Sequence, residues 1–151
     1  MLYEALKDRI SILNTCHVFE CLGSEELASV ACRACQEYYP DGADILMEDQ
    51  MNDNFYVVAR GAVSVSCTSS SGWIGTVSIL GEGNIMGEES IFEDARAGIL
   101  AEAVMGDVLL LKFKNKDIRN LMDRIPKIGN SLIRELTGKL ANLRKIIVTI
   151  G

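Results

Sequence analysis

The residues best suited to chemistry lie close together in segment 83–103, which reads GNIMGEESIFEDARAGILAEA. Gly87 and Glu88 open a short polar stretch, Ser90 follows, and Arg96 and Ala97 come near its end. A glycine lets the backbone come close to a ligand, and the free N–H groups at a helix start favour a bound anion. An arginine grips phosphate oxygens with two hydrogen bonds. The segment therefore holds the parts of an anion site.

A carboxylate in such a segment needs a different partner. Glu88 would repel a phosphate, so it fits the site only if it faces a sugar hydroxyl. An anion cradle, a cation and a hydroxyl acceptor together suit a nucleotide. Each residue also has a simpler interpretation. Glu88 can be an exposed acid at a strand end, Arg96 can pair with a neighbouring acid at the surface, and Ser90 can donate to the ligand or only cap a short helix.

The elements that must position these residues follow a helix, strand, helix order. Residues 1–40 carry helical patterns, with a first helix over 3–14 and a second that Ser24 caps and that ends before Pro40. From residue 41 to residue 114 short alternating apolar segments with glycine turns indicate antiparallel strands. Val63 and Val65 alternate with polar Ser64 and Ser66 as in a half-buried strand, and residues 108–111 are predicted to form a buried run. Residues 115–151 return to helix, with Asn115 as a cap and Pro126 as a break. We predict a mainly β fold with flanking helices (α+β), an antiparallel jelly-roll barrel in a single domain over 1–151.

The last predicted helix carries a heptad-like apolar seam. Its residues are spaced 3, 4, 3 and 4 apart: Ile133, Leu136, Leu140, Leu143 and Ile147. Two interpretations stay open. The seam can pack on the helix's own barrel, or it can pair two copies of the chain as a parallel homodimer.

Composition limits the function classes. The 151 residues are 48% hydrophobic and carry 21 acids against 15 bases, for a net charge of −6. No dense basic run supports direct nucleic-acid binding, and no apolar run is long enough to span a membrane. The start of the chain lacks the pattern of a signal peptide. We expect a cytoplasmic protein that is not an enzyme, because a metal-dependent enzyme on such a barrel needs several histidines and the sequence has one.

The five cysteines permit one other interpretation. An odd number without an export signal argues against a disulfide framework. Zinc or an iron–sulfur cluster could be held by four of them: Cys16, Cys21, Cys32 and Cys35. We favour no metal, because the 32–35 pair follows a helical pattern in which Cys35 continues the stripe of Leu27 and Ala31 and acts as a small hydrophobe.

Segment 83–103 resembles the phosphate-binding cassette of cyclic nucleotide-binding domains, the sensor modules of cAMP-receptor-type regulators and of cyclic-nucleotide-dependent kinases and channels. The resemblance runs from about residue 13 to about residue 143. It includes the turn at residues 39–42, the hairpin at 54–65 and the turn at 81–84. The cassette departs from the pattern in its short acidic loop before Arg96, in the absence of a proline there, and in Glu89, which replaces an apolar residue.

This resemblance implies roles for individual residues. Gly87 matches the family's cassette glycine, Glu88 the acceptor of the ribose 2′-hydroxyl and Arg96 the partner of the cyclic phosphate. The ligand contacts are expected from six residues: Gly87, Glu88, Glu89, Ser90, Arg96 and Ala97. Ala97 offers no hydroxyl to a guanine amino group, which favours cAMP over cGMP. The base is expected beneath the last helix, at Leu140, Asn142, Leu143 and Arg144, so that the ligand repositions this helix. No cofactor is implied beyond the nucleotide ligand.

Two alternatives come from other classes. The chain can be a degenerate jelly roll that no longer binds nucleotide and acts in dimerisation or docking, or it can be a redox sensor that uses the N-terminal cysteines. The helix-turn-helix of the transcription-regulating relatives has no counterpart before Gly151. The chain is therefore expected to be either a stand-alone sensor or part of a larger regulator.

Overall fold

The structure is a computed structural model of the chain. It describes residues 2–72, 74–93 and 95–150, and leaves the side chains of residues 2–4, 76, 77, 95 and 146–150 outside the description. The elements in chain order are α1 (Leu2–Asn14), α2 (Ser24–Ala31), β1 (Cys35–Tyr39), β2 (Asp44–Leu46), β3 (Met51–Asn52), β4 (Asn54–Thr68), β5 (Ile74–Leu80), β6 (Ile85–Met86), the 3₁₀ helix η1 (Glu88–Ser90), β7 (Ala95–Arg96), β8 (Leu100–Lys114), α3 (Asn115–Arg124) and α4 (Pro126–Ile150).

The strands form a mostly antiparallel sheet, as predicted. The main sheet has the order β1-β8-β4-β5, with β2 paired to β8 and β6 paired to β4, and β3 pairs with β7 in a separate small sheet. The predicted jelly-roll arrangement is therefore present, and within the described residues its sheet is open rather than closed into a barrel. The long strands β4 and β8 shift register around Arg60. Such bulges bend a strand and increase its twist.

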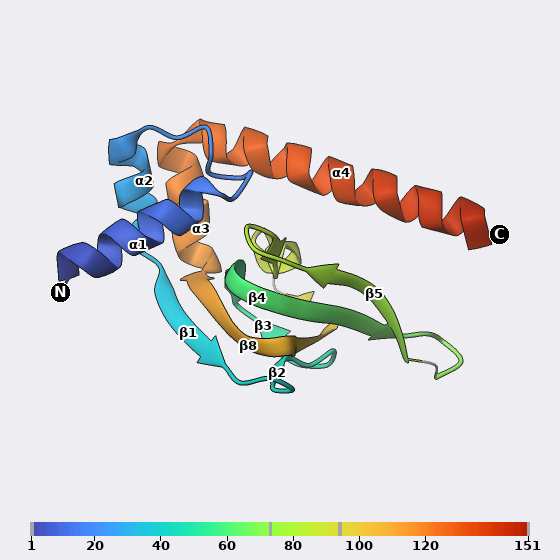
Figure 1. The fold of residues 1–151 in the computed structure, drawn as a ribbon. Helices are drawn as coiled ribbons and strands as arrows, with labels where there is room; N and C mark the ends of the chain where they lie inside the picture. The colour runs from blue at the N-terminus through green and yellow to red at the C-terminus, as the bar shows by residue number, and fades with distance from the viewer. Residues whose placement is uncertain (1, 73, 94, 151) are drawn as a thin grey trace.

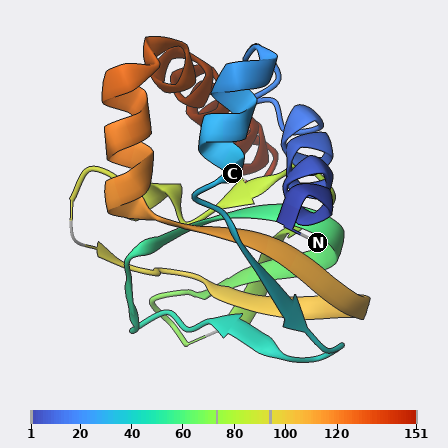
Figure 2. The same ribbon diagram turned by 90° about the vertical axis from the view of Figure 1, so that its left-hand side faces the viewer.

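The helices lie together on one side of the strands. Figure 1 shows α1, α2 and α3 grouped at one end of the sheet, while α4 runs outward over β5, and Figure 2 shows the helices above the strand layer. The helix-side core includes three aromatic rings, Phe19, Phe55 and Phe113, whose centroids lie 6.0–6.3 Å apart. Because successive strand residues point to opposite faces, Tyr56 joins a second buried cluster inside the curved sheet.

Several boundaries agree with the sequence patterns. The first helix and the break at Pro126 are confirmed, and Val63 and Val65 are buried on β4 as the alternation predicts. The predicted buried run near the end of β8 is confirmed too.

The N-terminal region differs from the prediction. The helix predicted to continue toward Pro40 ends at Ala31, and residues 35–39 instead form β1 along β8. The strands therefore begin within the region 1–40 that was predicted as helical. Cys35 is the first residue of β1 and is exposed, so its placement on a helical stripe was wrong. Cross-strand pairing outweighs the weak local preference for helix.

Two predicted caps are also displaced. Gly23, not Ser24, is the N-cap of α2, and its N–H donates to Glu26 Oε1 at 3.0 Å. Asn115 is the first residue of α3 rather than its cap, and Lys114 holds the cap position. Asn115 is buried, and its side chain donates a hydrogen bond to Ser90 Oγ of the cassette instead.

In the part of the chain that the structure describes, no helix combines the length and the apolar character that a membrane crossing requires.

Candidate functional site

Gly87 sets the conformation of the cassette. It joins β6 to η1 with φ +83, in the left-handed region that favours glycine. A Cβ at this position would lie 2.4 Å from the backbone oxygen of Asn54 and 2.9 Å from Nδ2 of Asn52. The sequence therefore needs glycine here both for backbone conformation and for space.

A buried polar network holds η1 against the sheet. Ser90 Oγ donates to the Gly87 carbonyl at 3.1 Å. It accepts hydrogen bonds from Asn52 Nδ2 at 3.3 Å and from Asn115 Nδ2 at 2.6 Å. The Ser90 hydroxyl therefore ties η1 to Asn52 and Asn115, and η1 has no side-chain cap. Ser90 borders a second hollow of about 410 Å³ at the start of α3.

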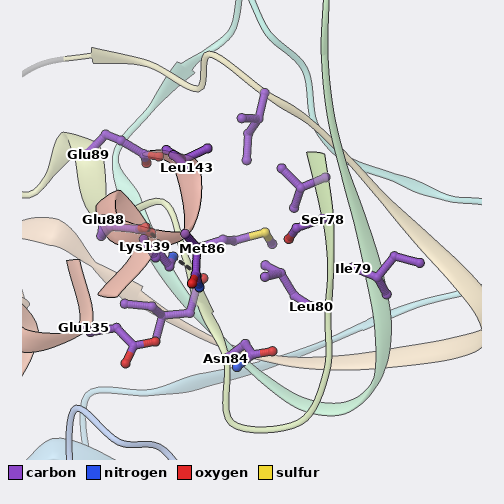
Figure 3. A pocket seen from close by; sticks show the side chains of 14 residues that line it. Ser78, Ile79, Leu80, Asn84, Met86, Glu88, Glu89, Glu135, Lys139 and Leu143 are labelled. Carbon is purple, nitrogen blue, oxygen red and sulfur yellow. Dashed lines mark hydrogen bonds and ion pairs between the residues drawn. The ribbon is translucent and has the colours of Figure 1, made fainter. Parts of the chain in front are cut away.

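The main cavity lies between η1, β5 and α4 and has a volume of about 440 Å³, within the usual range of small-ligand sites. Its apolar wall comes from Val65, Ile79, Leu80, Ile85, Met86, Ile99 and Leu143. Its polar groups come from Ser78, Asn84, Glu88, Glu89, Glu135, Lys139 and Asn142. Figure 3 shows Glu88 and Glu89 on one side and Ser78, Ile79 and Leu80 on the other. An apolar cavity with a few converging polar groups is a typical small-molecule site.

Glu88 is the most constrained acid of the cavity. It is only 5% exposed, and its Oε1 accepts a hydrogen bond from Lys139 Nζ of α4 at 2.5 Å (Figure 3). Its second oxygen, Oε2, is buried and makes no hydrogen bond in the structure. A buried acceptor without a donor is costly, so Oε2 fits a ligand that supplies a hydroxyl.

Glu89 adds to the negative charge of the cavity. The residue is exposed overall, but partial loss of solvation beside the cavity raises the pKa of its carboxyl, and the charge of Glu88 raises it further. Glu135 of α4 brings a third carboxylate to the same cavity. Lys139 is the one cationic side chain among the described lining residues. The cavity is therefore acidic around its apolar wall.

Arg96 and Ala97 belong to the cassette segment but do not line the cavity. The Arg96 side chain is exposed, and its Nη1 donates to the backbone carbonyl of Asp49. Ala97 is buried in the sheet cluster, and its N–H donates to the carbonyl of Gln50 at 2.8 Å. β7 nevertheless contacts η1, and Ile99 lines the cavity only a few residues further along the chain.

The residues predicted to cover the base are divided. Asn142 and Leu143 line the cavity, whereas Leu140 is 56% exposed and Arg144 is exposed outside the wall. Of the predicted seam, Leu136 packs partly on the chain's own core, while Ile133 and Leu140 stay exposed. The side chain of Ile147 lies outside the described residues.

Sequence reasoning missed Glu135 and Lys139. Their signal was available, because residues 135, 139, 142 and 143 share one face of a helix. Placing Asn142 and Leu143 at the ligand would have placed the other two there as well. The β5 wall had no comparable signal, since its position depends on the pairing of β4 with β5.

The cysteines do not form a shared site in the structure. Cys16 is fully buried, while Cys21, Cys32 and Cys35 are exposed. Across residues 2–72, 74–93 and 95–150, no group of three or more histidine, cysteine or acidic side chains is arranged to hold a metal ion. The geometry therefore gives the metal alternative no support.

Comparison with known proteins is consistent with the small-molecule cavity described above. Residues 36–125, more than half of the chain, match the family model described as "Cyclic nucleotide-binding domain". The chain belongs to this family.

Individual relatives extend the likeness beyond the matched segment. A curated "Cyclic AMP receptor protein" of Thermus thermophilus is 28% identical over 123 residues, which cover 82% of this chain and 56% of the relative. The crystal structure of the Thermus thermophilus catabolite activator protein aligns with a TM-score of 0.79 and 27% identity, covering 88% of this chain and 63% of that one. The chain thus spans little more than half the length of this curated relative.

Two more distant structures share the fold. A cyclic nucleotide-binding domain of Methylobacillus flagellatus aligns with a TM-score of 0.82 at 20% identity, covering 98% of this chain and 85% of its own. The regulatory domain of Toxoplasma gondii PKA, solved with cAMP, aligns with a TM-score of 0.79 at 22% identity, covering 90% of this chain and 51% of its own.

Proposed function

We propose that the cavity between η1, β5 and α4 binds a cyclic purine mononucleotide, with cAMP as the first candidate, and that the chain acts as a sensor rather than as an enzyme. The observation that carries this proposal is the buried, unpartnered Oε2 of Glu88 in the wall of an apolar cavity. A ribose hydroxyl supplies the missing donor. The family match and the relatives named for cAMP support the same ligand.

The residues around the cavity suggest which part of the ligand each of them contacts. The purine lies against the apolar wall at Ile79, Leu80 and Leu143, and the ribose lies at Glu88. The cyclic phosphate faces the backbone of η1 and is paired by Arg96. For this contact the Arg96 side chain must exchange the Asp49 carbonyl for a phosphate oxygen, a stronger acceptor because it is charged.

Isothermal titration with cAMP and cGMP at matched salt tests the proposal. We expect cAMP to bind more tightly than cGMP. Arg96→Ala should weaken binding by about tenfold or more, the usual worth of hydrogen bonds to a charged group. Arg60→Ala is the control, because Arg60 is also exposed on a strand but does not line the cavity. Equal affinity in the two variants would remove Arg96 from the phosphate site.

We further propose that α4 transmits the signal and pairs two copies of the chain. Ile133 and Leu140 are 64% and 56% exposed and lie seven residues apart, so they share one outward face of the helix. Light scattering after size exclusion should give a dimer mass for the wild type. Leu140→Glu should give a monomer, and a dimer in that variant would place the interface elsewhere.

One observation favours a second candidate, a docking module that has lost its ligand. Arg96 bonds to backbone outside the cavity, and the cavity itself is acidic. Thermal unfolding with and without cAMP separates the two functions, since a ligand that binds only the folded state raises Tm. An unchanged Tm at saturating cAMP favours docking. The cytoplasmic location expected from the sequence remains a prediction.

A further inference from the structure

Lys139 connects α4 to the cassette at the residue assigned to the ligand. Its Nζ lies 2.5 Å from Glu88 Oε1 and donates to the backbone carbonyl of Ile85 at 3.1 Å. The lysine side chain is 35% exposed and the glutamate side chain 5% exposed. The glutamate of this ion pair is therefore buried in the protein interior, and the lysine is the member that contacts solvent.

The ammonium and the ligand hydroxyl need the same carboxylate. Oε1 of Glu88 is occupied by Lys139, and Oε2 is closed off from solvent without a hydrogen bond. A hydroxyl entering from solvent must therefore displace Lys139 from Oε1 or open a path to Oε2, which is buried. Because Lys139 belongs to α4, displacing it changes the contact between α4 and the cassette.

We propose that Lys139 is an internal competitor for the ligand's hydroxyl acceptor, so that the nucleotide binds only after α4 releases Glu88. This inference rests on the proposed function and adds to it the contact that opposes binding. A ligand shifts such an equilibrium by its preference for the released state. The apparent affinity of the wild-type protein for the nucleotide is lowered, because only the molecules in which Lys139 has left Glu88 can bind.

The surrounding charges favour the tied state in the free protein. Glu89 borders the cavity next to Glu88, and Glu135 lies one helical turn before Lys139 on α4. These carboxylates all attract the single ammonium of the described cavity wall. Loss of that ammonium leaves Glu88 as an uncompensated buried charge, a strongly unfavourable state. The carboxylate can regain water if α4 moves away, so removal of Lys139 opens the cavity rather than closing it.

Titration of cAMP into matched variants tests the competition. Lys139→Ala removes the ammonium and keeps a good helix former, and we expect it to bind cAMP about fivefold more tightly or better, a normal size for coupling between sites. Lys139→Arg keeps the charge and should stay close to wild type. Arg134→Ala is the control, because it removes one positive charge from an exposed position of α4 that does not line the cavity.

Hydrogen exchange on the ligand-free proteins provides a readout that does not need a nucleotide. Backbone amides of residues 136–145 should exchange faster in Lys139→Ala than in the wild type or in Arg134→Ala. Weaker cAMP binding by Lys139→Ala would overturn the competition, because it would make Lys139 a ligand contact. Unchanged hydrogen exchange in Lys139→Ala would also overturn the competition, because the stability of α4 would then not depend on the contact between Lys139 and Glu88.

The two proposals fail in different ways. If neither the wild type nor Lys139→Ala binds cAMP or cGMP, the proposed function is wrong and the competition falls with it. The exchange measurement alone then decides whether Lys139 holds α4 against the cassette. If both proteins bind with equal affinity, the proposed function stands and the competition is refuted.

Discussion

Replacing Gly87 with alanine tests the geometry of the cassette directly. The residue has φ +83, and its added Cβ would lie 2.4 Å from the Asn54 carbonyl oxygen. A relaxed carbon–oxygen contact is about 3.3 Å, so η1 or β4 must move by about 0.9 Å. The left-handed backbone costs about 1–2 kcal/mol for a residue with a Cβ. Crowding in a packed interior costs about 1–3 kcal/mol more.

Gly42 supplies a matched control for the backbone part of this cost. Its φ is +84, nearly the same as that of Gly87, but a Cβ there would meet nothing within 4 Å. Gly42→Ala should therefore cost only the conformational part, about 1–2 kcal/mol. The difference between the two variants isolates the close approach of Gly87 to Asn54.

Thermal and urea unfolding measure this difference. For a chain of this size each kcal/mol lowers Tm by about 2–4 °C, so a total cost of about 3 kcal/mol lowers Tm by about 6–12 °C for Gly87→Ala. Gly42→Ala, with a cost of about 1–2 kcal/mol, should lose about 2–8 °C. In cAMP titrations below these temperatures, Gly87→Ala should bind more weakly, because η1 carries Glu88. Equal losses of Tm in the two variants would refute the steric argument.

Two further predictions concern ionisable groups. Partial desolvation and the charge of Glu88 raise the pKa of Glu89 above 4.5, so the folded protein holds that proton more tightly than the unfolded chain does. The resulting stabilisation is complete below the unfolded pKa and is lost as pH rises through the folded pKa. It is small, because Glu89 is exposed and water screens its charge. Glu89→Gln should therefore raise the free energy of unfolding near neutral pH and have less effect below pH 4.5; urea unfolding at both pH values checks this, and an equal effect at both would contradict it. Burial also raises the pKa of Cys16 to about 11, and because the thiolate is the reactive form, iodoacetamide should modify exposed Cys21 in the native protein and Cys16 only after unfolding. Peptide mass spectrometry compares the two sites, and equal labelling of native protein would show that Cys16 is accessible.

Local patterns were sufficient for much of the fold. The strand alternation at Val63 and Val65 and the helix break at Pro126 depend on neighbours in the chain, and both appear in the structure. The glycine of the cassette was also recognisable, because a tight approach of backbone requires a residue without Cβ. Placement of Cys35 was wrong, because its conformation follows from pairing with a strand more than seventy residues away.

The sequence by itself determined the family, the order of helices and strands, and the residue types of the cassette, since these are written in short-range spacing. Only the tertiary structure decided which of those residues meet. It placed Glu88 in the cavity and Arg96 outside the wall, and it turned Ser90 into the centre of a buried network. It also brought Lys139 of α4 onto Glu88, a contact between residues 51 positions apart. Spacing along the chain does not encode such contacts, because they depend on how a helix packs across a folded sheet.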